Sequence, residues 1–360
     1  MLEPRQPIHV RRQDRFRPPH CPWPECHEHL ATTGTFEFKR EGFYLRKRSP
    51  RRIRRYRCRS CNRTFSRDAF STTYYLKRPE LLIPIATWLV SGSAHRQIAR
   101  AIGCAPSTVT RLSVRIGRHS ELFHRRAIGE LHLLDEPVVL DHFETFVRSQ
   151  TERLGIGTAV GQRSLFVYAL SGAAYLRVRG RSRKKRALKQ RPRDTPRGDM
   201  ARSTRRILRT LLALAPGGLD LVTDAHPAYR SAIRTLRQQD QSAAVSVRHV
   251  VHANPDRSPG HDRAIARRRN HAMFAVDALH KLLRHSQSHH RRETIAFGRR
   301  RSSVLGRTAL FAVWRNMIKL VTERRPTRLT PAIRLGLTAV RWTWIDVFAE
   351  RIFAARLQRS

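Results

Sequence analysis

The chain has 360 residues, 40% of them hydrophobic, which suits two or three domains with buried cores and excludes a disordered basic tail. Its formal net charge is +45, from 72 basic and 27 acidic residues, and its isoelectric point is near 11.8. No apolar run approaches the ~20 residues of a membrane-spanning helix, so we expect no role within a bilayer.

The charge indicates the class of partner. Positive charge attracts phosphate polyanions at long range. Only eight of the basic residues are lysine and the other 64 are arginine, whose guanidinium group binds phosphate oxygens in pairs. A polybasic protein of a membrane surface is the alternative use of such charge. We expect the partner to be a nucleic acid.

Two short cysteine pairs predict a metal site in residues 21–75, after a Pro- and Arg-rich segment (1–20) that we expect to be flexible. Cys21 and Cys26 stand in CPWPEC, and Cys58 and Cys61 stand in YRCRSC. Four thiolates delivered as two pairs can close a tetrahedral site for a structural zinc ion. Disulfide bonds in a secreted protein are the alternative, but the polar, Arg-rich N-terminus does not read as a signal peptide. Because the first gap is four residues rather than two, one histidine could replace a cysteine: His20, His27 or His29.

The stretches between and beside these pairs complete the predicted zinc ribbon. Residues 36–48 are expected to form a hairpin, and residues 48–57, RSPRRIRRYR, a basic arm or strand that faces phosphate.

Residues 76–128 carry a helix-turn-helix pattern. Ala99 supplies a small side chain where two helices would touch, Gly103 allows the tight turn, and Val109 and Leu112 anchor the second helix. Pro106 suits the first turn of that helix, and residues 81–90 supply a supporting helix. An ordinary helical hairpin is the alternative. The predicted groove-facing residues are Ser107, Thr108, Thr110, Arg111 and Arg115.

Residues 129–322 are patterned as a catalytic domain. An apolar, β-branched stretch ends on Asp141 and Glu144, two more strands follow, and residues 200–214 read as an amphipathic helix. A further strand then ends on Asp224 and leads into a helix. The order β-β-β-α-β-α is that of the ribonuclease-H-like fold, in which carboxylates on the first and fourth strands meet. Two such acids suit divalent metal binding.

A third acid is expected on a later helix. Residues 270–285 contain no proline or glycine, and Asp277 lies off the apolar stripe of that segment. A solvated surface aspartate is the alternative reading, and Glu293 in RRETIAF is the rival third acid.

Two segments carry no catalytic prediction. The basic run at 180–199 is either a solvated loop or a loop that contacts phosphate. Residues 323–360 are expected to form a C-terminal helical segment.

These motifs resemble the DDE transposases of bacterial insertion sequences, particularly the insertion-sequence-one-like group. The resemblance runs from Cys21 to about Lys319. It rests on the cysteine ribbon before a helix-turn-helix, on LDHFE at 140–144, on LVTD at 221–224 and on RETIAF at 292–297. Counting back from Arg292 to the family's Ile-Glu position reaches Val276 and Asp277, so aspartate stands in place of glutamate. The spacing between the second and third acids is also longer than in the family.

The resemblance implies a multidomain α/β protein: a small zinc ribbon, a helix-turn-helix domain, and a ribonuclease-H-like catalytic domain with C-terminal helices. It implies cleavage and strand transfer of DNA with two Mg²⁺ or Mn²⁺ ions. Asp141 would bridge both ions, Asp224 would hold one, and Asp277 or Glu293 the other.

The partners implied are the double-stranded DNA of the element's ends and of its target. The protein would form a homo-oligomer on DNA in the bacterial cytoplasm, at the nucleoid. A tyrosine recombinase is disfavoured because Tyr229 follows an acid and a proline rather than standing in a basic pocket. A non-catalytic DNA-binding regulator, or a decayed transposase, is the alternative.

Overall fold

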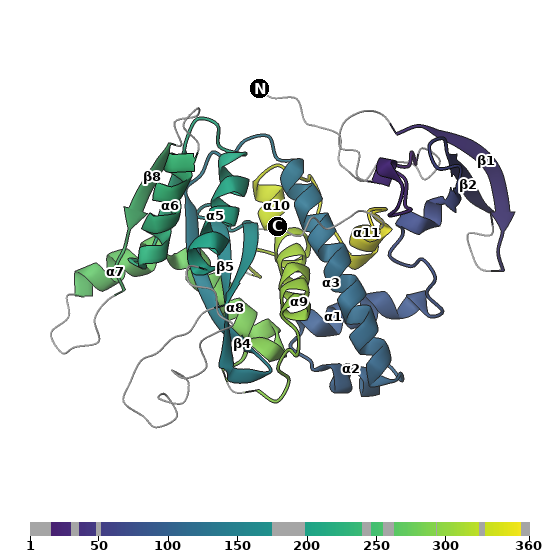
Figure 1. Ribbon diagram of the computed structural model, residues 1–360. Coiled ribbons are helices and arrows are strands. Elements are labelled where there is room, and N and C mark those ends of the chain that lie inside the picture. The colour runs from purple at the N-terminus through teal and green to yellow at the C-terminus, as the bar shows by residue number, and fades with distance from the viewer. Residues whose placement is uncertain are drawn as a thin grey trace.

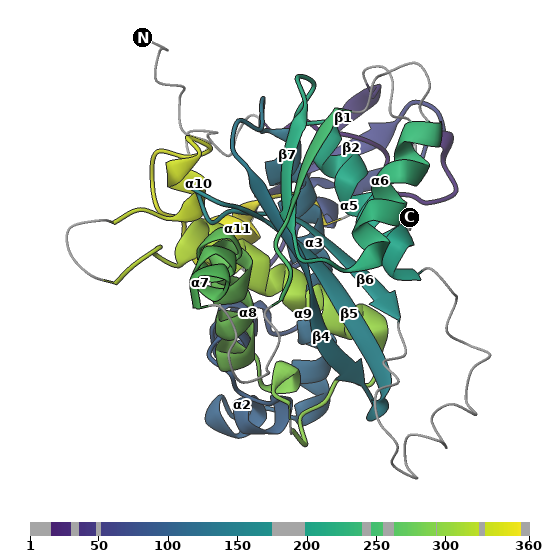
Figure 2. The ribbon, with the colours of Figure 1, turned by 90° about the vertical axis from the view of Figure 1, so that its left-hand side faces the viewer.

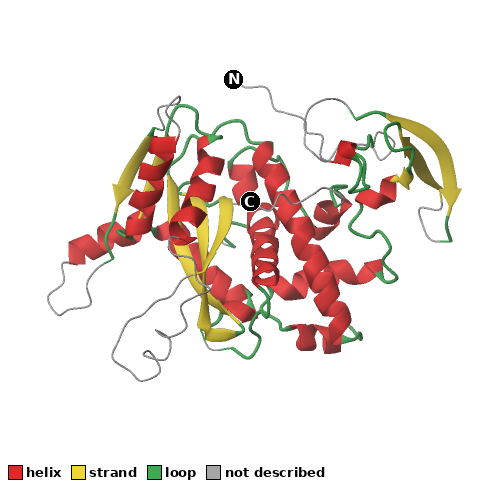
Figure 3. Ribbon diagram, in the orientation of Figure 1, coloured by secondary structure: helices red, strands yellow, loops and turns green. Residues whose placement is uncertain are grey.

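The computed structural model describes residues 16–29, 36–47, 52–174, 199–239, 246–254, 263–292, 294–323 and 328–353. It is a mixed α/β protein (Figures 1 and 3). A small three-stranded sheet lies at one end, a group of helices follows, and a five-stranded sheet with helices on its faces forms the other end. Glu293 and most of the basic run at 180–199 lie outside the described residues.

The small sheet is built from β1 (Phe38–Leu45), β2 (Arg52–Cys58) and β3 (Thr64–Ser66), paired antiparallel in that order. Residues 36–48 were expected to form a hairpin by themselves. They instead provide a single strand, β1, whose antiparallel partner is β2, the predicted basic strand. Aromatic side chains pack together against the sheet, and four of them are buried: Phe36, Tyr56, Phe65 and Phe70. Two short 3-10 turns flank it, η3 (His27–His29) and η4 (Arg67–Phe70).

Four helical elements follow: η5 (Pro79–Leu81), α1 (Leu82–Val90), α2 (His95–Ala101) and α3 (Pro106–Gly129). Ala99 and Val109 are buried where α2 meets α3, and Gly103 turns the chain between them with φ +62°, a conformation that glycine adopts without strain. Pro106 begins α3, as predicted. At 24 residues α3 is about 36 Å long, far longer than a helix-turn-helix needs.

The large sheet has the strand order β6-β5-β4-β7-β8. The first three in sequence, β4 (Val138–Val147), β5 (Ser149–Gly161) and β6 (Val167–Ala174), form an antiparallel meander. β7 (Leu219–Thr223) pairs parallel with β4, and β8 (Val247–Val251), a strand the sequence did not predict, pairs parallel with β7. The first strand was expected to end on its acids. It continues to Val147 because β5 pairs with its whole length.

Helices cover both faces of this sheet (Figure 2). α5 (Asp199–Leu212) and α6 (Pro227–Gln239) lie on one face, and α8 (Phe274–Ser286) and α9 (Arg301–Val313) lie on the other. Alternate β4 residues supply the two cores: Leu140 joins the cluster of α5 and α6, while Phe143 joins the cluster of α8 and α9. The single helix expected at 270–285 is two, because the chain bends at Met273 between α7 (Arg263–Ala272) and α8.

The C-terminal segment returns to the N-terminal domains. After the 3-10 turn η6 (Ser288–His290) and helix α9, the chain forms a π-helical turn η7 (Trp314–Ile318) and two short helices, α10 (Pro331–Arg334) and α11 (Trp344–Ala349). The Val347 carbonyl lies 2.7 Å from His119 Nε2 on α3, and the Phe353 N–H donates to the Phe70 carbonyl over 2.9 Å. Asp68, beside the small sheet, pairs with Arg351 at 3.2 Å.

A close glycine crossing joins α3 to α9, which packs on the five-stranded sheet. Gly117 on α3 faces Gly306 on α9, and a Cβ added to Gly117 would lie 3.0 Å from the Gly306 Cα. Two backbones can approach this closely only where neither residue has a side chain.

Gly117→Val therefore forces the two helices apart. We expect a loss of about 1–3 kcal/mol of unfolding free energy, measured by thermal or denaturant unfolding. Gly129→Val, on the same helix with nothing within 4 Å of an added Cβ, is the control and should shift stability by less than about 1 kcal/mol. Equal losses in the two variants would contradict the close crossing.

Candidate active site and metal cluster

The four predicted cysteines meet beside the small sheet. The sulfur atoms of Cys21, Cys26, Cys58 and Cys61 all lie within 4.8 Å of one another. Two of the separations, Cys21 to Cys61 and Cys26 to Cys58, are 3.8 Å. A tetrahedron with Zn–S bonds of about 2.3 Å has edges of roughly 3.8 Å. The group can therefore hold a metal ion such as zinc.

The alternatives raised by the sequence do not fit this geometry. A separation of 3.8 Å is far beyond a disulfide bond, and all four cysteines are free. The metal-binding group contains no histidine, and His29 Nδ1 instead lies 2.7 Å from the Cys21 carbonyl. Burial raises the pKa of the Cys21 thiol and that of Cys26. A bound cation would reverse this cost by stabilising the thiolates.

Four of the five predicted groove-facing residues lie on the first turns of α3, and the fifth, Arg115, binds backbone carbonyls instead. Ser107, Thr110 and Arg111 are exposed along the first turns of α3, and Thr108 is half-buried. Arg115 was expected to face DNA but turns inward. Its Nε donates to the Thr72 carbonyl and its Nη2 to the Tyr74 carbonyl, each over 2.6 Å. These bonds fix the segment between the small sheet and the helices, so Arg115 is a structural residue here.

Asp141 and Asp224 are brought together by strand register. β4 and β7 run parallel, and their last paired residues are Leu140 and Thr223. The residue after Leu140 is Asp141 and the residue after Thr223 is Asp224. The two aspartates therefore occupy neighbouring positions on adjacent strands. Asp141 also lies on the α8 side of the sheet, since it alternates with Leu140 and His142.

Protein atoms surround the Asp141 carboxylate, although 22% of its side-chain surface remains open. Its Oδ1 accepts the His142 N–H over 2.7 Å and the Tyr229 hydroxyl over 3.3 Å, while its Oδ2 lies 3.7 Å from His280 Nδ1. Burial, followed by the negative charges of Asp224 and Asp277, raises the pKa of Asp141 to about 7. A cation bound beside the carboxyl would favour its ionised form and lower this pKa.

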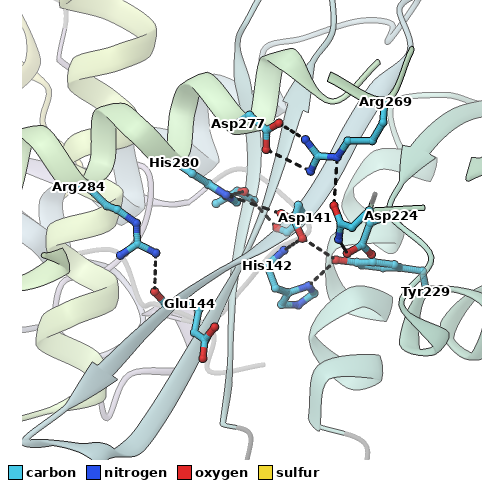
Figure 4. A network of polar contacts seen from close by, with 11 residues as sticks. Asp141, His142, Glu144, Asp224, Tyr229, Arg269, Asp277, His280 and Arg284 are labelled. Atoms are coloured by element: carbon cyan, nitrogen blue, oxygen red, sulfur yellow. Dashed lines mark hydrogen bonds and ion pairs between the residues drawn. The ribbon is translucent and has the colours of Figure 1, made fainter. Parts of the chain in front are cut away.

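The other two acids are linked by polar side chains (Figure 4). Asp224 Oδ1 accepts the His226 N–H over 2.9 Å, and its Oδ2 accepts the Asn254 side-chain amide over 3.1 Å. Asp277, on α8, accepts two bonds from the Arg269 guanidinium on α7. Arg269 Nε in turn donates to Asn254 Oδ1 over 3.1 Å. A continuous chain of contacts therefore joins Asp277 to Asp224.

Two half-buried histidines and a buried tyrosine lie beside Asp141, and sequence reasoning did not predict them as site residues. His280 Nε2 lies 2.8 Å from the Thr158 hydroxyl, which fixes the ring beside Asp141. Burial lowers the pKa of His280 to about 3, so the ring is neutral at physiological pH. On the opposite side, His142 Nδ1 lies 3.1 Å from the Tyr229 hydroxyl. His280 follows Asp277 by one helical turn, a spacing that offered a signal in the sequence.

The donor set fits a hard divalent cation, because carboxylates and the Asn254 amide carbonyl are oxygen ligands. The carboxylates of the three aspartates are not gathered as closely as the cysteine sulfurs. Within the described ranges, only the cysteine group brings three or more potential ligands inside 4.8 Å. Asp277 is engaged by Arg269. Metal binding at the aspartates therefore requires Asp277 to leave this ion pair, or a ligand from elsewhere.

No protein-family model matches the chain, and no curated protein matches its sequence. Among the residues that the structure describes, no helix has the length and apolar character needed to cross a bilayer.

Metal analysis tests the cysteine cluster. Reduced, full-length protein should carry one zinc ion per chain by elemental analysis, and Cys58→Ser should lose it together with the fold of the small sheet. Cys104→Ser removes the one cysteine outside the cluster and should retain the metal. Zinc-free wild-type protein with a folded small sheet would contradict the assignment.

The pKa of Asp141 predicts how stability depends on pH without divalent cations. Since the pKa is raised on folding, the native protonated form is favoured at low pH, and this advantage is lost as pH rises from about 4 to about 7. Wild-type stability should fall by up to a few kcal/mol relative to Asp141→Asn over that range, at about 1.4 kcal/mol per pKa unit. Parallel stability curves for the two proteins in EDTA would show that the pKa is ordinary.

Proposed function

We propose that this protein is a DDE-type transposase that binds the ends of its insertion sequence and cuts and joins DNA with divalent cations. The observation that carries the proposal is the placement of Asp141 and Asp224 at equivalent positions of two adjacent parallel strands. Carboxylates at that place, in a chain with a net charge of +45, suit a site that handles phosphodiesters.

The strand topology supports a ribonuclease-H-like catalytic domain. A three-stranded antiparallel meander is followed by a helix and two strands parallel to the first, in the order β6-β5-β4-β7-β8. The first and fourth strands, β4 and β7, carry the two acids. This is the arrangement that the resemblance to insertion-sequence transposases implies.

The chain's own residues would prepare the acids for chemistry. Tyr229 and the His142 N–H fix one oxygen of Asp141, and neutral His280 approaches the other without competing as a cation. Asn254 orients Asp224. Divalent cations bound here would activate the attacking water or 3′-hydroxyl and stabilise the leaving 3′-oxygen. The acids would then act by orientation and charge, with no covalent bond between protein and DNA.

The N-terminal half would select the DNA. Ser107 and Arg111 stand exposed at the start of α3, where a recognition helix reads base edges. The cysteine cluster, holding zinc, would fix the small sheet, whose basic strand β2 would contact backbone phosphate. Phosphate contacts position a protein without reading sequence, so specificity falls to the helix.

A non-catalytic DNA-binding regulator is the second candidate. It is favoured by one observation, the ion pair that engages Asp277 with Arg269. A regulator would keep the DNA-binding half and lose nothing when the aspartates are changed.

Substitution of the acids separates the two functions. On cognate DNA ends with Mg²⁺ or Mn²⁺, Asp141→Asn and Asp224→Asn should lose cleavage and strand transfer by several orders of magnitude, because each removes a metal ligand but keeps the side-chain volume. DNA binding should survive in both variants. Asp277→Asn should be inactive and Glu293→Gln merely impaired.

Asp220→Asn is the matched control, since it lies on β7 and pairs with Arg248 away from the site. It should cleave as wild type does. An active Asp277→Asn with an inactive Glu293→Gln would transfer the third-acid role to Glu293. Wild-type protein as inert as Asp141→Asn and Asp224→Asn would favour the regulator.

A further inference from the structure

We propose that Arg269 is a built-in substitute cation that occupies the carboxylate site before DNA binds and must be displaced by the divalent metal. This inference rests on the proposed function and adds a regulatory contact to it. The Arg269 guanidinium stands between the second and third acids and contacts Asp277 directly and Asp224 through Asn254 (Figure 4).

The contacts are specific. Two guanidinium nitrogens, Nη1 and Nη2, donate to the two oxygens of Asp277, and the third, Nε, donates to Asn254, which donates to Asp224. All three nitrogens are therefore used on one side of the site. The arginine side chain is only 13% exposed and Asp277 30%, so water screens the pair incompletely. A planar fork with fixed charge is suited to hold a carboxylate in this way.

The bend at Met273 makes the contact possible. Arg269 precedes Asp277 by eight residues, which in one straight helix would separate them by about 12 Å along the axis. Met273 departs from helical geometry, with φ −94° and ψ 4°, and Arg269 in the last turn of α7 bonds across it to Asp277 in the first turn of α8. A small change of this bend would carry Arg269 away from Asp277 without altering the sheet.

Competition follows from charge. A metal cation that Asp277 helps to hold needs the same Asp277 oxygen atoms as the Arg269 guanidinium, so each weakens the binding of the other. DNA offers the displaced guanidinium a phosphate in place of the carboxylate. Binding of DNA and of metal would then favour each other by the same factor, since such coupling is reciprocal. The metal would then bind weakly until the protein has bound DNA.

Direct metal binding tests this inference. The probe is Mn²⁺, with free ion counted by electron paramagnetic resonance in titrations of full-length protein without DNA. Arg269→Gln should bind Mn²⁺ about tenfold more tightly than wild type, in line with typical site–site coupling. Arg267→Gln removes the same charge from an exposed position of α7 and should stay close to wild type. Adding random-sequence duplex should tighten binding in wild type more than in Arg269→Gln.

Arg269→Lys keeps the charge but not the fork, and should fall between wild type and Arg269→Gln. If Arg269→Gln does not fold, the Mn²⁺ affinity of Arg269→Lys is compared with that of wild type in its place. Asp141→Asn identifies the site, because it should lose the Mn²⁺ ion. If Arg269→Gln, or Arg269→Lys in its place, binds no tighter than wild type while Asp141→Asn loses the ion, the inference is wrong and the proposed function stands. If no Mn²⁺ binding depends on Asp141 with or without DNA, both are wrong.

Discussion

The structure depends on one electrostatic constraint, the placement of two carboxylates side by side on adjacent strands of a buried sheet. β4 and β7 bring Asp141 and Asp224 to equivalent positions, and α8 adds Asp277 nearby. Burial and mutual repulsion disfavour ionisation, which raises the pKa of Asp141. Such a site is stable only with protons or cations. The raised pKa of Asp141 favours its protonated form, and the guanidinium of Arg269 pairs with Asp277 in the protein alone. Divalent cations with DNA would take over both roles in the proposed reaction.

The long helix α3 connects this site to the N-terminal half, which we propose binds DNA. Its first turns expose Arg111, its middle crosses α9 at Gly117, and His119 receives the returning C-terminal segment. Arg115 fixes the link to the small sheet through two backbone carbonyls. One rigid element therefore carries both the residues that would read DNA and the contacts that hold the sheet. Such a connection would present a bound DNA end at a defined distance from the acids.

The sequence predicted the features that depend on short stretches of neighbouring residues. The cysteine cluster follows from two short pairs, and the proximity of Asp141 and Asp224 follows from acids that succeed apolar, β-branched runs. Other features depend on distant partners. β4 continues past Asp141 because β5 pairs with it, and Arg115 turns inward because its acceptors lie 41 and 43 residues away. The bend that brings Arg269 to Asp277 falls at Met273, with no proline or glycine to mark it. Hydrophobic pattern alone could not place these contacts.

The most direct measurement is a crystal structure of the full-length protein with Mn²⁺ and a DNA end, in which manganese is located by its anomalous scattering. The account predicts a manganese peak between the carboxylates of Asp141 and Asp224. It also predicts that Arg269 has left Asp277 and contacts a DNA phosphate. A complex with DNA bound across α3, no manganese at the aspartates and the Arg269–Asp277 pair intact would contradict it.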